Sequence, residues 1–116
     1  MKAIVWPTSE EVQPPLDFEE KLCAALRGRV KRIFVFGSYG TEAFRPGSDI
    51  DLILVCETDL PFVERPRLFE DLYRIYPRLD LLVYTEEELA QQLSESAGFW
   101  ASVKAGLREL SVDRHE

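Results

Sequence analysis

Residues 37–51 read GSYGTEAFRPGSDID, in which a Gly-Ser pair is followed, after ten further residues, by Asp49-Ile50-Asp51. Apolar runs flank this stretch, with Val30–Phe36 before it and Ile50–Cys56 overlapping its end. Each run has the length and composition of a buried β-strand. A later run, Leu79–Val83, predicts a third strand. The stretch therefore connects two strands of one predicted sheet.

Asp49 and Asp51 stand at alternate positions of the second predicted strand. Side chains alternate along a strand, so both carboxylates point to the same face. Two like charges held so close repel each other, and a hard divalent cation with carboxylate ligands relieves that repulsion. The small Gly37-Ser38 turn would let backbone N–H groups and a hydroxyl approach phosphate oxygens. Metal and phosphate sites together predict phosphoryl or nucleotidyl transfer.

A plain connecting turn is the alternative, because turns are rich in Gly, Ser and Asp. That alternative explains Gly47-Ser48, and we interpret Ser48 as a turn residue that supports Asp49. It does not explain Asp51, which stands inside a run of Ile, Leu and Val. An acid in a buried strand is rarely kept unless it is paired or metal-bound. The functional interpretation is therefore favoured.

At these residues the chain resembles the minimal nucleotidyltransferase (MNT) family of the DNA polymerase β superfamily, whose signature is G-S-x(10)-D-x-D. The resemblance runs from about Leu26 to Leu110. It implies an α/β (α+β) polymerase β-like fold, with a mixed sheet of three to four strands and helices packed against it. It also implies two Mg²⁺ ions and ATP as nucleotide donor, with Asp49 and Asp51 as the catalytic metal ligands.

The family carries a third carboxylate on a later strand, and Asp80 fits that position. The resemblance makes Asp80 a catalytic residue and metal ligand that could accept the proton of the attacking hydroxyl. If the third strand pairs beside the second, Asp80 reaches the face of Asp49 and Asp51. The alternative is that Asp80 is an ordinary residue at the start of a strand, whose side chain hydrogen-bonds to a neighbouring turn.

The nucleotide phosphates are expected to contact Gly37, Ser38 and Arg45. Arg45 stands where a related pattern, A-R-P-x-S-D-I-D, also has arginine. The chain departs from many relatives at residues 40–42, where it reads Gly-Thr-Glu instead of Ala-Arg-Gly. An arginine that could meet phosphate is therefore missing at Thr41.

Minimal nucleotidyltransferases are commonly antitoxins paired with a helical HEPN-domain ribonuclease toxin. The resemblance implies transfer of AMP to a hydroxyl of a protein acceptor, a toxin tyrosine, within a hetero-oligomer. Two alternatives stay open. One is a non-catalytic antitoxin that neutralises the toxin by binding, and the other is a nucleotidyltransferase acting on a small molecule. The sequence shows no acceptor-binding domain, which disfavours the alternative of a small-molecule acceptor.

The 116 residues predict one domain, 1–116, in which residues 1–15 form an irregular arm. The net charge of −7 disfavours direct nucleic-acid binding. No apolar run approaches the ~18 residues of a membrane span, and the N-terminus lacks a signal-peptide pattern. Cys23 and Cys56 are interpreted as reduced core residues of a cytoplasmic protein. His115, near the C-terminus, is too isolated for Ser-His or Cys-His chemistry.

Helical segments alternate with the predicted strands. Thr85 with Glu88 forms a capping-box pattern, and we interpret the acids at 86–88 as helix-start residues and not as metal ligands. Residues 107–112 fit a short edge strand or the end of a helix. The expected helices are Leu16–Leu26, one from Pro66 to Pro77, one from Thr85 through Leu93, and Phe99–Lys104.

Overall fold

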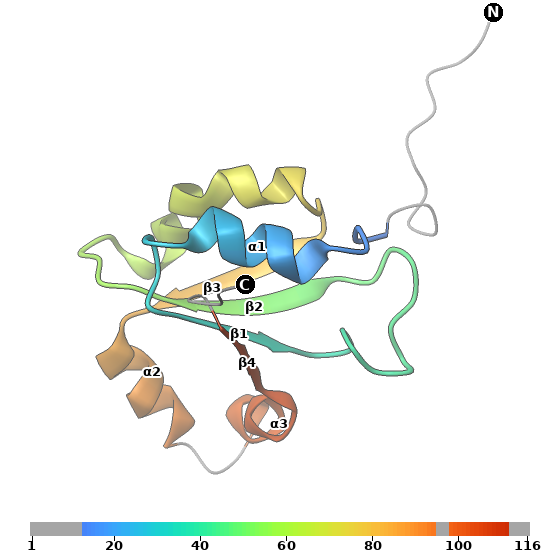
Figure 1. Cartoon of the computed structure of the whole chain (residues 1–116). Coiled ribbons are helices and arrows are strands. Elements are labelled where there is room, and N and C mark those ends of the chain that lie inside the picture. The colour runs from blue at the N-terminus through green and yellow to red at the C-terminus, as the bar shows by residue number, and fades with distance from the viewer. Residues whose placement is uncertain (1–12, 95–97, 112–116) are drawn as a thin grey trace, which may run out of the picture.

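The computed structural model describes residues 13–94 and 98–111. Most of the predicted arm and His115 lie outside the described residues. The elements are α1 (Phe18–Leu26), β1 (Arg32–Phe36), β2 (Ile50–Val55), η2 (Phe62–Arg74), β3 (Leu79–Tyr84), α2 (Glu86–Leu93), α3 (Phe99–Gly106) and β4 (Arg108–Leu110) (Figure 1). Helices packed on a mixed sheet confirm the predicted fold class.

The sheet has the strand order β3-β2-β1-β4. β1 runs antiparallel to both β2 and β4, whereas β2 and β3 are parallel. Parallel neighbours need a crossover connection, and η2 supplies it. As a result β2 and β3 begin at the same end of the sheet, where the antiparallel β1 ends. β4 lies at the edge beside β1, which settles residues 108–110 as an edge strand.

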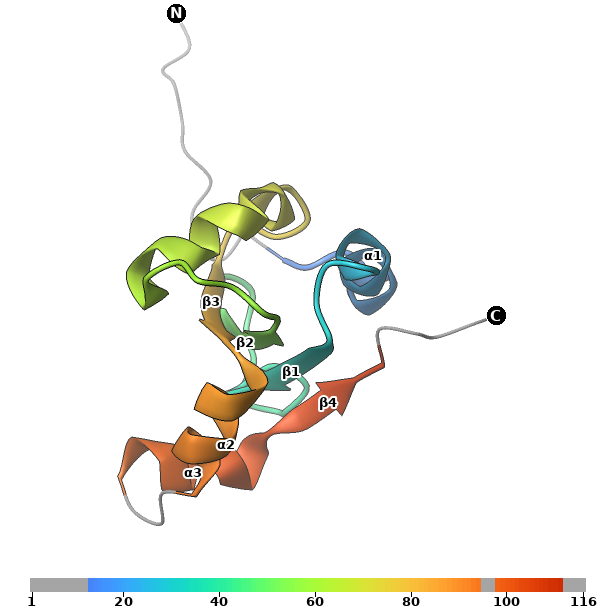
Figure 2. The same ribbon diagram turned by 90° about the vertical axis from the view of Figure 1, so that its left-hand side faces the viewer.

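Helices cover both faces of the sheet, with α1 and η2 on one side and α2 and α3 on the other (Figures 1 and 2). A hydrophobic core lies on each face of the sheet, and alternate residues of β2 pack into one or the other. Leu52 and Leu54 pack beneath α1 and η2. Ile53 and Val55 join the cluster that contains Leu89 of α2. Burial on both faces explains why the strands read as continuous apolar runs.

Three of the four predicted helices, those at α1, α2 and α3, are close to those observed. α1 starts at Phe18, and Gly28, with φ of +79°, follows its end. The capping box of α2 is confirmed, because the Thr85 hydroxyl accepts from the Glu88 amide and the Glu88 carboxylate accepts from the Thr85 amide. These bonds satisfy N–H groups that a helix start leaves without an intrahelical partner.

The connection between β2 and β3 differs from the prediction. We expected Pro66 to open an α-helix, but a 3₁₀ segment begins at Phe62 and contains Pro66. Its backbone is interrupted at Phe69, where φ is −126° and ψ is 27°. Proline lacks the N–H needed to continue a helical hydrogen-bond ladder, and its ring clashes with the preceding turn of an α-helix. The tighter 3₁₀ turns therefore replace the regular helix.

The two cysteines lie in the core as predicted, and several aromatic side chains are also buried or half-buried. Cys23 and Cys56 are both free and buried. Tyr76 is fully buried, and its hydroxyl donates to the Ser48 carbonyl at 2.6 Å. Trp100 is half-buried, with its ring centroid 5.7 Å from that of Tyr84. None of the helices in the described ranges is long and apolar enough to cross a membrane.

Candidate active site

The strand register brings two of the predicted carboxylates together. In the parallel pair β2–β3, Asp51 lies opposite Asp80. In the antiparallel pair β1–β2, Asp51 also lies opposite Phe36, the residue before Gly37. Residues opposite each other in a sheet share a face. The Gly37 turn and the two acids therefore meet at the end of the sheet where β1 ends and β2 and β3 begin.

The Asp51 carboxylate lies in an environment that opposes its charge. Asp51 is half-buried and Asp80 is exposed. Burial is the main cause that raises the pKa of Asp51, and the charges of Asp80 and Asp49 and a hydrogen bond with the Asp80 side chain raise it further. Such a pair is stabilised by a shared proton or by a bound cation.

Asp49 is placed differently from the other two acids. Its side chain is 60% exposed, and its Oδ1 accepts from Arg78 Nε at 3.2 Å. Among residues 13–94 and 98–111, no group of three Asp, Glu, His or Cys side chains is arranged to hold a metal ion. Asp49 is thus paired with Arg78 while Asp51 is paired with Asp80.

Gly37 is in direct contact with the acid pair. Its φ is +82°, a conformation that L side chains rarely adopt. A Cβ atom added there would meet the Asp51 carboxylate. The backbone of the turn therefore approaches Asp51 more closely than any residue with a side chain would allow.

The turn after Gly37 presents unused backbone donors. Within the described part of the chain, no hydrogen bond is donated by the amides of Ser38, Tyr39 and Gly40. The Ser38 carbonyl accepts from the Thr41 amide at 3.0 Å and from its hydroxyl at 2.7 Å. Consecutive free N–H groups in such a turn form an anion-binding concavity. Thr41, which stands at the position where the sequence pattern lacks the usual arginine, closes this turn.

Arg45 holds its own loop together. Its guanidinium donates to the carbonyls of Glu42 at 2.6 Å and Phe44 at 3.1 Å. Its amide donates to the Ser48 hydroxyl at 3.0 Å, so Ser48 closes the turn as expected. A phosphate contact of Arg45 stays a prediction, and it would need these guanidinium bonds to be exchanged.

Two arginines at the site were not identified from the sequence. Arg78 lies in the turn immediately before β3, next to Asp49, which immediately precedes β2, and no motif in the sequence indicated this contact. Arg108 lies on β4 and donates from Nη2 to the Tyr39 carbonyl at 3.2 Å. It is separated from Tyr39 by 69 residues, so nothing local in the sequence indicated it.

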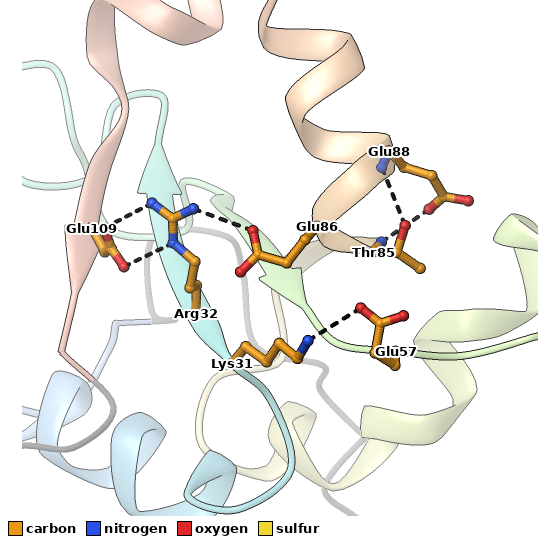
Figure 3. A network of polar contacts seen from close by, with 7 residues as sticks. All are labelled: Lys31, Arg32, Glu57, Thr85, Glu86, Glu88 and Glu109. Atoms are coloured by element: carbon orange, nitrogen blue, oxygen red, sulfur yellow. Dashed lines mark hydrogen bonds and ion pairs between the residues drawn. The ribbon is translucent and has the colours of Figure 1, made fainter.

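The acids at the start of α2 take part in structural contacts (Figure 3). Glu86 accepts from Arg32 of β1 at 3.4 Å, and Arg32 also contacts Glu109 of β4 at 3.2 Å. Glu88 caps the helix with Thr85. These contacts agree with the interpretation of residues 86–88 as helix-start acids.

Comparison with known proteins places the chain in a family. Residues 17–113 match the family described as nucleotidyltransferase domain. The chain belongs to the nucleotidyltransferase domain family. The match includes the Gly37 turn and all three predicted carboxylates. Membership places this nucleotidyltransferase domain in the transferase class.

Two individual proteins are also similar to parts of this chain. A protein of Methanocaldococcus jannaschii, provisionally named a protein adenylyltransferase, is 38% identical over 47 residues, which are 40% of this chain and 47% of that protein. The match thus spans about half of that relative's length. A crystal structure from Sulfolobus solfataricus, provisionally titled a nucleotidyltransferase, aligns with a TM-score of 0.46 and 20% identity, over 63% of this chain and 66% of that one.

Proposed function

We propose that this nucleotidyltransferase domain transfers AMP from ATP to a hydroxyl of a protein, with the help of a divalent metal. The observation that carries the proposal is the register that sets Asp51 opposite Asp80, next to the close approach of Gly37. Paired acids beside free backbone N–H groups suit a metal-bound triphosphate, because the two parts of the site complement cation and anion.

The acids fit a hard divalent cation such as Mg²⁺. Asp51 and Asp80 would hold it, since burial and the neighbouring charges of Asp80 and Asp49 raise the pKa of Asp51 and a bound cation would offset both effects. Asp49 would join them on exchanging its contact with Arg78. When bound, the metal supplies charge neutralisation for the entering and leaving oxygens of phosphoryl transfer.

The chain's own groups would orient the reaction. The amides of residues 38–40 and the Ser38 hydroxyl would bind the outer phosphates. The acceptor oxygen would attack the α-phosphorus, forming the new P–O bond while the bond to pyrophosphate breaks in line. Asp80, the exposed member of the pair, would take the proton that the hydroxyl releases.

A protein is the acceptor class that we favour. The matched segment of the M. jannaschii relative belongs to a protein named for adenylylation of proteins. The net charge of −7 suits a complex with a basic, RNA-binding partner. We therefore propose a cytoplasmic antitoxin whose partner and substrate is a HEPN-domain ribonuclease toxin, modified on tyrosine.

The test is AMP transfer to that partner. Incubation of the chain with a HEPN partner, ATP and Mg²⁺ should increase the partner's mass by one AMP, located on a tyrosine by peptide mass spectrometry. Asp51→Asn should lower the rate by about 100-fold or more, because electrostatic stabilisation of the transferred group is lost. Asp59→Asn, which removes an exposed carboxylate outside the site, should transfer AMP as the wild type does.

Two further measurements define the result. Chelation of Mg²⁺ should stop transfer by the wild type, and ATP titration should show binding that strengthens with Mg²⁺ and weakens in Asp51→Asn. Transfer that persists undiminished in Asp51→Asn would overturn the catalytic assignment.

A second candidate is an antitoxin that neutralises by binding alone. The observation in its favour is the ion pair of Asp49 with Arg78, which engages one predicted metal ligand. Under this alternative, Asp51→Asn would still neutralise the toxin in cells and the wild type would leave the toxin's mass unchanged.

A further inference from the structure

We propose that Arg108 binds the outer phosphates of the nucleotide and supplies the basic side chain that the turn itself lacks at Thr41. This inference rests on the proposed function and names a residue outside the sequence motif. It starts from the position of Arg108 on β4, where it pairs with Val35 of β1. The strand delivers the side chain to the backbone of the turn that follows β1.

The guanidinium of Arg108 lies directly against this turn. Its Nη2 donates to the Tyr39 carbonyl at 3.2 Å, and its Cζ lies 5.8 Å from the centre of the Tyr39 ring. At Gly40, φ is +83° and an added Cβ would lie 2.6 Å from Nη2. Glycine at this position therefore leaves the space that the guanidinium occupies.

Arg108 keeps donors for a ligand. A guanidinium has five N–H donors, and one contact with Tyr39 leaves most of them available. Arg108 is exposed, and it forms no ion pair with a carboxylate within the described residues. Arg45, the arginine within the loop, is instead bonded to its own carbonyls. Arg108 is thus the cation in contact with the turn.

The ligand is the polyphosphate part of a nucleoside triphosphate. The Arg108 guanidinium reaches the Tyr39 carbonyl from the sheet face that it shares with Val35, and the Ser38, Tyr39 and Gly40 amides belong to the same turn. Arginine binds phosphate through two parallel N–H bonds, and backbone amides add further donors. Such a surface favours the most highly charged end of the nucleotide.

The experiment compares nucleotides that differ in phosphate number. Calorimetric titrations with ATP, ADP and AMP, all with Mg²⁺, are made on the wild type, Arg108→Gln, Arg108→Lys and Arg67→Gln. Arg67→Gln is the matched control, because it removes the same charge from an exposed arginine of η2. Thermal unfolding of each variant verifies that it is folded.

Arg108→Gln should weaken ATP binding about 10- to 100-fold, as expected for loss of a charged hydrogen bond to phosphate. AMP binding should be almost unchanged, Arg108→Lys should retain part of the ATP affinity, and Arg67→Gln should match the wild type. Equal ATP affinities for wild type and Arg108→Gln would overturn the inference and leave the proposed function standing. An equal loss of ATP and AMP affinity would also overturn it. Failure of the wild type to bind ATP would overturn the proposed function itself.

Discussion

At the scale of single residues, the backbone of Gly37 and the carboxylate of Asp51 lie so close that only glycine fits at residue 37. The positive φ of Gly37 brings the turn onto the carboxylate, and that contact leaves no room for a Cβ atom. Gly28 has a similar φ of +79°, yet an added Cβ there meets nothing within 4 Å. The two glycines share one backbone conformation and differ in their surroundings. They therefore allow the effect of the contact to be separated from the effect of the backbone.

Gly37→Ala should destabilise the fold more than Gly28→Ala. Each change forces an L residue into a left-handed conformation, at about 1–2 kcal/mol, and Gly37→Ala adds the collision with Asp51. Chemical denaturation measures the difference in the free energy of unfolding, and ATP titration should show weakened binding only for Gly37→Ala. Equal stability losses with unchanged ATP affinity would show that the contact is unimportant.

At the scale of elements, one buried arginine joins η2 to β3 and α2. Arg65 is 6% exposed, and its guanidinium donates to Glu88 Oε1 at 2.6 Å and to Oε2 at 3.1 Å. It also donates to the carbonyls of Leu60 at 2.8 Å and Val83 at 3.0 Å. A bidentate pair of this kind fixes both position and orientation. Glu88 thus caps its own helix and anchors the crossover segment.

The stability of this junction should depend on acidic pH. The Arg65 guanidinium, together with the Thr85 amide, lowers the pKa of Glu88 from 4.5 to about 2. A lowered pKa stabilises the folded state above pH 4.5, and that contribution is lost as the pH falls from 4.5 towards 2. Glu88→Gln should cost about 1.5–3 kcal/mol at neutral pH, as expected for a lost hydrogen bond to a charged group.

The measurement is the free energy of unfolding as a function of pH. The curves of wild type and Glu88→Gln should converge as the pH falls through this window. Glu87→Gln, which changes an exposed neighbour on the same helix, should follow the wild-type curve. A constant gap between wild type and Glu88→Gln down to pH 2 would contradict the assigned role.

At the scale of the whole molecule, the arrangement of the candidate active site depends on packing against both faces of the sheet. The core beneath α1 and η2 contains Leu52, next to Asp51 in β2, and this side chain is fully buried. Packing on both faces keeps the register of β2 against its neighbours, because a slip of one residue would exchange the two faces. The position of Asp51 opposite Asp80 is therefore maintained by the core.

Leu52→Ala should cost about 2–5 kcal/mol of unfolding free energy, the usual range for a large-to-small change in a packed core. Leu16→Ala is the matched control, because Leu16 is fully exposed and its removal creates no cavity. Urea denaturation of the two variants provides the comparison. A Leu52→Ala variant as stable as Leu16→Ala would mean that this core does not hold the sheet.

The sequence by itself determined the local features of this protein. The apolar runs predicted the strands, including the one that carries Asp51, and the Thr85-x-x-Glu88 spacing placed a helix start. These features depend on neighbours within a few residues, which local backbone geometry controls. Asp49, which we expected on the same strand face as Asp51, instead precedes β2 and pairs with Arg78. The 3₁₀ form of η2 was not predicted, because we placed Pro66 at a helix start, whereas the segment begins at Phe62 and is interrupted at Phe69.

Only the tertiary structure decided which distant residues meet. Asp80 reaches Asp51 because β3 pairs parallel to β2, and the sequence left that pairing as a condition. Arg108 touches Tyr39 because β4 adds to β1 at the sheet edge, and Arg78 meets Asp49 where the segments before β3 and β2 lie side by side. Strand order and register are set by the packing of the whole core, and no local period encodes them.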